Sequence, residues 1–398
     1  LARQLSGGLV HNQQFDYDDY GLSLDVFFAL DALHTRPRAA RSVLNAVAAD
    51  PGAYVGSGAE SYAGATGKLA TAVKLAGRNP RSFGGVNLVA RLQQRVHTAQ
   101  DAQHGRATDQ SQYGDYSNTI GQTFVVRGLA GAGSSLADEA TRFLVKQQCS
   151  AGFFREGMDS ADYTCDGGTA AQSGSSVDAT GFAVQALVAA RSHGMRGLNG
   201  SIRKASSWLV RVQRSNGSFG GNGVANTNST GLGATALALT GRSVAAERAG
   251  AWVSRRQVTD VVAARSPRLT KEVGAIAYTS TQLSAARASG ITSDVRDQYQ
   301  RATAQAAIGV NAVRKLRVVA PAGARHRRTR VAVSLSGLAP RERWTLRLGT
   351  NVVDRGRATA RGVASASFRL PGRVGRYDVR AVGFSSARTG RDSVRVVR

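Results

Sequence analysis

Two kinds of apolar segment alternate along residues 1–315, and this alternation constrains the fold of the chain more than any other feature. In the first kind, a polar stretch leads into a run that is apolar almost all round and rich in Ala and Gly, which predicts a buried helix. The second kind is amphipathic, has a Gln near its end and is often followed by a Gly-rich turn. Pairs of such helices, recurring at roughly 45–65 residues, predict stacked helical hairpins.

Copies of both kinds can be read from the sequence. The buried copies lie at residues 18–30, 118–129, 177–187 and 228–237, with a looser copy at 61–75. The amphipathic copies lie at residues 1–8, 143–148 and 208–221, with weaker copies at 88–94 and 252–257. Because Leu1 falls inside an amphipathic copy, we expect that residues upstream of it have been removed.

The hydrophobic period changes from helical to strand-like after Leu316. Apolar and polar residues then alternate in short runs at residues 331–336, 344–348, 363–370, 377–382 and 393–397. Short alternating strands at this spacing predict a small β-sandwich. We therefore expect a helical domain at residues 1–315 and a β-sandwich at residues 316–398. No apolar run approaches the roughly 20 residues that a membrane-spanning helix needs.

Positive charge is concentrated in the predicted sandwich. Residues 316–398 carry 19 Arg and four acidic residues, a net charge of +15, whereas residues 1–315 have a net charge of +11. GC-rich codon usage would also enrich Arg, but a dense arginine surface attracts polyanions, and salt weakens that attraction. The sandwich lacks the aromatic interleaving of nucleic-acid-binding proteins, and the chain lacks zinc-finger and basic-zipper patterns. These absences disfavour nucleic acid and leave an anionic cell-wall polymer or a lipid surface as the candidate partner.

Two helical tracts resemble a known family. Trp208, Gln213 and the run 216–220 are similar to the QW-type repeat of squalene cyclases and protein prenyltransferases, and residues 180–187 are similar to the inner helix that follows it. The resemblance covers most of residues 1–315 and implies an α/α toroid, with an inner ring of helices inside an outer ring. The C-terminal segment resembles bacterial immunoglobulin-like modules. The expected fold class is thus multi-domain and mainly α, with a toroid of helical hairpins before a small immunoglobulin-like β-sandwich, as in a group of secreted bacterial proteins.

The resemblance suggests one catalytic motif, Asp16-Tyr17-Asp18-Asp19. Class II terpene cyclases use a D-x-D-D motif whose middle Asp protonates an alkene, so the resemblance makes Asp18 the general acid beside Asp16 and Asp19. Clustered carboxylates suit this role because neighbouring charge keeps one of them protonated. Against it, the acids lie three positions early for that family's register, and only 6% of residues are aromatic. The alternative is that the three aspartates cap a helix N-terminus.

The turns before the predicted inner helices form a second candidate site. If the ring closes, these turns share one rim, where acidic, amide and aromatic side chains suit a sugar or other small molecule, or a peptide. Helix capping is the alternative role for them. The candidate ligand-binding residues are Tyr17, Tyr20, Tyr113, Asp115, Tyr116, Asn118, Asp178, Asn226 and Asn228.

The two cysteines indicate the cellular compartment in which the protein works. A disulfide between Cys149 and Cys165 would close a short loop and stabilise it by about 3 kcal/mol in the chain-entropy model. Two buried thiols are the alternative. We expect the disulfide, and with it a secreted or cell-envelope location. Neither the cysteines nor the scattered histidines form a metal-ligand pattern, and we expect no metal and no cofactor.

Together these features predict a secreted, non-catalytic binding protein of the cell envelope. The rim of its toroid would bind a ligand or partner, and its basic sandwich would hold it at an anionic surface. The alternative is an enzyme like the class II terpene cyclases that protonates a polyprenoid with Asp18. The low aromatic content and the shifted register favour the binding role over catalysis.

Overall fold

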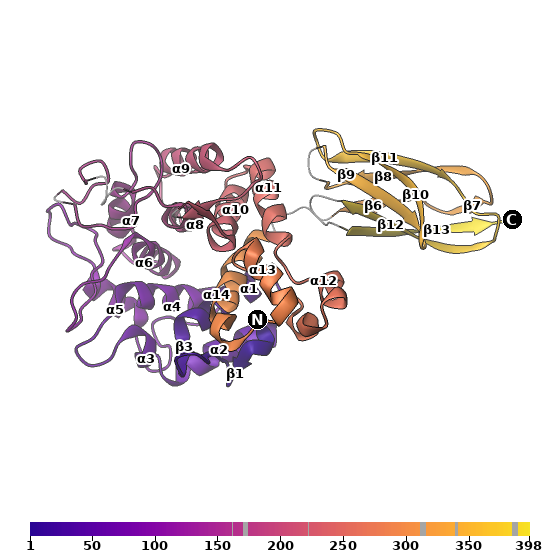
Figure 1. The fold of residues 1–398 in the computed structure, drawn as a ribbon. Coiled ribbons are helices and arrows are strands. Elements are labelled where there is room, and N and C mark those ends of the chain that lie inside the picture. The colour runs from indigo at the N-terminus through magenta and orange to yellow at the C-terminus, as the bar shows by residue number, and fades with distance from the viewer. Residues whose placement is uncertain (161, 170–173, 222, 311–315, 339–340, 384–388) are drawn as a thin grey trace.

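The computed structural model describes the chain except for residues 161, 170–173, 222, 311–315, 339–340 and 384–388. Helices predominate up to Val310, and the strands from Arg317 onward share a hydrophobic core of their own (Figure 1). The end of the predicted helical domain, at residues 311–315, lies outside the described residues. Within the described part, no helix combines the length and the apolar character needed to cross a bilayer.

Six helices form a closed inner ring. Each packs against the next, and α14 packs against α1, which closes the ring. They are α1 (Tyr20–Ala32), α4 (Ala63–Leu75), α6 (Thr119–Gly131), α8 (Val177–Ser192), α10 (Thr227–Leu239) and α14 (Ser293–Val310). The five segments predicted to be buried supply five of these helices, and α14, which was not among them, completes the ring.

Glycine allows the inner helices to approach closely. A Cβ added at Gly67 of α4 would lie 2.5 Å from the backbone nitrogen of Val125 on α6. A Cβ added at Gly231 of α10 would lie 2.5 Å from the Cα of Ala306 on α14. Because real side chains do not tolerate such distances, the Ala- and Gly-rich composition of these segments follows from the packing of the ring.

A second set of helices packs on the outside of the ring. Each outer helix contacts the inner helix that precedes it in the chain. They are α2 (Pro37–Ala49), α5 (Leu88–Arg95), α7 (Ala137–Lys146), α9 (Asn199–Val212) and α11 (Ser243–Ser254). Shorter helices fill the remaining connections: α3 (Gly52–Val55), α12 (Asp260–Arg265), the 3₁₀ helix η2 (Pro267–Glu272) and α13 (Ser280–Ser289).

The amphipathic helix predicted at residues 1–8 is wrong. The chain begins with a 3₁₀ turn, η1 (Ala2–Gln4), and continues as a sheet of β1 (Leu5–Ser6), β2 (Leu9–Asn12) and β3 (Tyr17–Asp19). Gly7 and Gly8 have φ angles of 58° and 99°, which permit the tight turn between β1 and β2. The small sheet leads directly into α1.

The strands after Arg317 form two sheets with a shared core. One has the order β10–β9–β12–β13–β7 and the other the order β11–β8–β6. The strands are β6 (Arg317–Val319), β7 (Ala324–His326), β8 (Arg330–Ser336), β9 (Arg343–Leu348), β10 (Asn351–Arg357), β11 (Val363–Arg369), β12 (Gly375–Gly383) and β13 (Thr389–Val397). Alternate residues such as Val333, Leu346 and Val379 fill the core. All five predicted strands are present, and β4 (Gly220–Gly221) and β5 (Val224–Ala225) form a separate small hairpin within the helical part.

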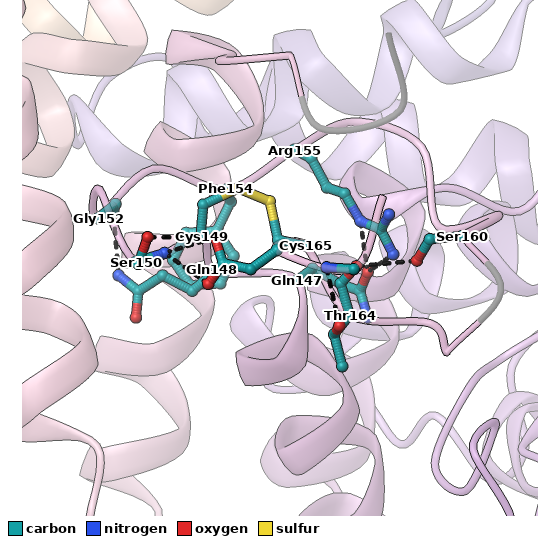
Figure 2. The surroundings of a disulfide bond; sticks show 12 residues. Gln147, Gln148, Cys149, Ser150, Gly152, Phe154, Arg155, Ser160, Thr164 and Cys165 are labelled. Atoms are coloured by element: carbon teal, nitrogen blue, oxygen red, sulfur yellow. Dashed lines mark hydrogen bonds between the residues drawn. A yellow bond between two sulfur atoms is a disulfide. The ribbon is translucent and has the colours of Figure 1, made fainter. Parts of the chain in front are cut away.

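A disulfide joins Cys149 and Cys165, as predicted, with their Cα atoms 4.9 Å apart. Inside the loop that it closes, the side chain of Arg155 is fully buried. Its Nε and Nη2 donate hydrogen bonds to Oε1 of Gln147 at 2.9 and 2.7 Å (Figure 2). Gln147 in turn donates to the carbonyl of Tyr163 at 2.9 Å. A covalent link and a buried polar network therefore hold this loop together.

Candidate functional site

The predicted acidic motif lies on the hairpin before α1, where Asp16 and Asp18 are exposed. Their side chains are 96% and 50% exposed, and His11 of β2 lies beside both. The His11 Nε2 is 3.2 Å from an Asp16 carboxylate oxygen, and Nδ1 is 3.0 Å from one of Asp18. The hydrogen bond with Asp18 raises the pKa of His11. Asp16 and Asp18 therefore form a surface cluster with a histidine and do not cap α1.

Asp19 has the capping role that the alternative interpretation assigned to all three aspartates. One carboxylate oxygen accepts a hydrogen bond from the backbone N–H of Leu22 at 2.7 Å and so caps α1. The other oxygen pairs with Nη2 of Arg301 on α14 at 2.5 Å. Asp19 is buried, and it connects the first and last helices of the inner ring.

Two further candidate residues are also caps. The Asn118 side chain accepts from the N–H of Gly121 at 2.9 Å at the start of α6. The Asn226 side chain accepts from the N–H of Ser229 at 2.8 Å at the start of α10. Both amides satisfy backbone groups of inner helices, so the alternative interpretation describes them correctly.

The remaining candidates on the first three turns lie mostly at the surface. Asp115 forms an ion pair with Arg106 at 2.7 Å. Tyr113 and Tyr116 are 72% and 70% exposed. Tyr17 is 45% exposed, whereas burial raises the pKa of the less exposed Tyr20.

Asp178 and Asn228 are the candidates that offer unused acceptors. One carboxylate oxygen of Asp178 and the amide oxygen of Asn228 are buried and have no hydrogen-bond partner within the described part of the chain. They lie in the first turns of the adjacent helices α8 and α10. Burial raises the pKa of Asp178, although a hydrogen bond with Ser229 opposes the shift. This corner of the rim is suited to a ligand that donates hydrogen bonds.

Aromatic side chains of three inner helices meet on the inside of the ring. Phe28 of α1 stacks on Phe124 of α6 with ring centroids 6.1 Å apart, although α4 lies between these helices in the ring. The Phe124 ring is also 5.4 Å from that of Phe182 on α8. Nearby, Lys68 of α4 pairs with Asp25 of α1 at 2.6 Å. Aromatic and charged side chains of four successive inner helices therefore form a layer that faces the inside of the ring.

The sequence carried a signal for this layer that the prediction missed. The buried repeats can be aligned on Ser23, Thr66, Gln122 and Thr180. The residues two positions later are Asp25, Lys68, Phe124 and Phe182. The same position in successive inner helices therefore points into the ring. The sequence interpretation considered the turns before the helices and left this position out.

Two of the cavities in the helical part lie between inner helices. One of about 230 Å³ opens between the first turns of α4 and α6, and its lining includes Tyr62, Asp109, Tyr116 and Asn118. A larger one of about 1060 Å³ lies where α14 meets α1 and contains none of the predicted site residues. Within the described residues, no three side chains of metal-ligating types gather closely enough to hold a metal ion.

No protein-family model and no curated protein matches the chain. Among solved structures, a protein from Actinoplanes is similar at a TM-score of 0.52 and 16% identity, covering 78% of this chain and 95% of that one. The ent-copalyl diphosphate synthase from Streptomyces platensis aligns at a TM-score of 0.45 and 14% identity, covering 73% of this chain and 50% of that one. The chain thus spans about half the length of the synthase. The likeness to the Actinoplanes protein concerns the fold alone.

Proposed function

We propose that this is a secreted or envelope-associated binding protein whose β-sandwich attaches to an anionic cell-wall polymer. The main observation behind this proposal is a row of arginines across one sheet. Arg380 of β12 lies directly opposite Arg347 of β9 on one side and Arg391 of β13 on the other. Arg376 of β12 and Arg395 of β13 form a second pair of opposite arginines. All five side chains are exposed.

The charge of this row is not balanced by ion pairs. Within the described residues, none of its five arginines forms an ion pair with a carboxylate. Asp354 and Asp392 accept hydrogen bonds from backbone N–H groups instead. Like charges directly opposite on neighbouring strands are destabilising. An anionic polymer lying across the strands, which are about 4.8 Å apart, would relieve that repulsion.

The sandwich itself is best interpreted as immunoglobulin-like. Its three-strand sheet β11–β8–β6 corresponds to strands E, B and A of that fold, and β9, β12 and β13 correspond to C, F and G. The disulfide in the helical ring supports an oxidising compartment. Both features agree with a protein that works outside the cytoplasm.

The test is binding of the full chain to purified polyglycerol-phosphate wall polymer over a range of salt concentrations. We expect the triple variant Arg347→Gln, Arg380→Gln, Arg391→Gln to bind at least tenfold more weakly and with a smaller salt dependence. The control variant Arg317→Gln, Arg361→Gln, Arg373→Gln removes the same charge from positions outside the row. Equal loss in both variants, or salt-independent binding by the wild type, contradicts the proposal.

An acid-catalysed role of the ring is the second candidate. The Asp16–Asp19 motif resembles that of class II terpene cyclases. One carboxylate oxygen of Asp178 is buried without a hydrogen-bond partner within the described residues, and burial raises the pKa of this residue, which favours a proton donor at the rim. Incubation with squalene and with geranylgeranyl diphosphate, followed by product analysis, tests it. If product forms and is lost in Asp18→Asn, Asp18 is the general acid. If product is lost only in Asp178→Asn, the general acid is Asp178 on α8. Absence of product with both substrates favours the binding role.

A further inference from the structure

Arg127 of α6 extends into the centre of the ring without an ionic partner. Its guanidinium lies 5.4 Å from the ring centroid of Phe28 and 5.5 Å from that of Phe124. Within the described part of the chain it forms neither a hydrogen bond nor an ion pair, although it lies in the same layer as the paired Lys68 and Asp25. Burial lowers its pKa to about 10, so it keeps its charge at neutral pH.

Arg127 is partly exposed, so its guanidinium still reaches the space inside the ring. The contacts with the faces of Phe28 and Phe124 use none of its N–H donors. These donors are therefore available to an anion that enters the ring.

We propose that Arg127 is the anion-binding group of a ligand site in the centre of the ring, and that the ligand is a carboxylate with a flat apolar body. A guanidinium presents paired N–H donors that match the two oxygens of a carboxylate. A flat body would stack against the partly exposed rings of Phe28 and Phe182. The guanidinium would then hold the polar end and the phenylalanines the apolar end.

This proposal gives the helical ring a ligand of its own, and the site is separate from the arginine row of the sandwich. The two proposals therefore fail independently. Loss of polymer binding leaves the ring site untouched, and failure of the ring site leaves attachment through the sandwich unaffected.

The experiment uses benzoate as the probe and benzamide as its neutral analogue, measured by calorimetric or NMR titration of the full chain. We expect benzoate to bind at least tenfold more tightly than benzamide. Arg127→Gln should raise the Kd for benzoate at least tenfold. The control Arg142→Gln removes one charge from the exposed face of the outer helix α7 and should leave the Kd unchanged.

Thermal stability separates this proposal from a structural role. A structural role for Arg127 would consist of its contacts with Phe28 and Phe124. If the charge serves only these contacts, Arg127→Gln lowers Tm and benzoate has no effect on the wild type, which overturns the proposal. If the charge awaits a ligand, the Tm of Arg127→Gln without benzoate is equal to or above that of the wild type. Should Arg127→Gln not fold, Arg127→Lys keeps the charge and should bind benzoate more weakly than the wild type. Equal benzoate affinity in Arg127→Lys contradicts a role for the paired donors.

Discussion

At the scale of single residues, one short motif shows how position decides role. Asp16, Asp18 and Asp19 lie within four residues, but Asp19 alone stands where β3 ends and α1 begins. It is therefore buried as a cap, while the other two remain on the exposed hairpin with His11. The sequence left helix cap and general acid as alternative roles for these three residues. It could not separate them, because the hairpin that orients them depends on pairing with residues 9–12.

The pairing of His11 with Asp18 predicts a pH effect. Asp18→Asn removes the carboxylate, so the pKa of His11 should fall toward its ordinary value. In the wild type the raised pKa favours folding below the unfolded-state pKa of histidine, and this contribution disappears as pH rises through the folded-state value. NMR titration of the His11 ring signals measures the shift, with His34 as an internal reference. An unchanged His11 titration would show that the two side chains do not interact in solution.

At the scale of helices and strands, the repeats predicted most of the fold. Inner and outer helices differ in sequence because one kind is surrounded by protein and the other has a wet face, so hydrophobic periodicity separates them. Strand β10 was missed because Asp354, Arg355 and Arg357 interrupt the alternation that marks a half-buried strand. Residues 1–8 were misassigned because their Leu and Gln spacing imitates the amphipathic repeat, while their hairpin depends on tertiary pairing.

The close approach of α10 and α14 gives a prediction at this scale. Gly231→Ala places a Cβ against the backbone of Ala306 and should destabilise the fold by roughly 1–3 kcal/mol through overpacking. Gly200→Ala in the outer helix α9 meets nothing within 4 Å, so it should be neutral or stabilising. Urea unfolding of both variants provides the comparison. Equal effects would mean that the two inner helices can move apart at no cost.

The disulfide in the loop between α7 and α8 gives a second prediction at this scale. Replacing Cys149 and Cys165 together by Ser should lower the free energy of unfolding by about 3 kcal/mol, since the unfolded chain gains freedom. Differential scanning calorimetry measures the loss. Reduction of the wild type with dithiothreitol should lower Tm in the same direction, whereas the double variant should not respond to the reductant. A wild type whose Tm is insensitive to complete reduction would contradict a stabilising disulfide.

At the scale of the whole molecule, the ring depends on contacts between distant parts of the chain. Asp19 pairs with Arg301, and the Asn12 amide donates to Asp297 at 3.2 Å. The turns of the predicted rim lie at the starts of the inner helices, but most of their polar side chains serve as caps or ion pairs. The sequence predicted the closed ring, but it did not predict which polar groups would remain free inside it, because that depends on partners from other helices.

A double-mutant cycle tests how strongly the ring is closed. Asp19→Asn retains an oxygen that can cap α1 but loses the ion pair, and Arg301→Gln removes the other partner. The coupling energy should be about 0.5–1 kcal/mol, at the lower end for contacting residues because Arg301 is partly exposed. Chemical unfolding of the two single variants and the double variant gives the value. Strictly additive effects would show that the ion pair does not help to join α1 to α14.

The contact between Asp19 and Arg301 joins residues 282 positions apart in sequence. A ribosome adds about 5–20 residues per second, so on the order of 15–60 s separates the synthesis of the two partners. During that interval the flank of α1 that packs on α14 in the finished ring has no partner from the end of the chain. It can therefore meet other apolar surfaces before the ring closes.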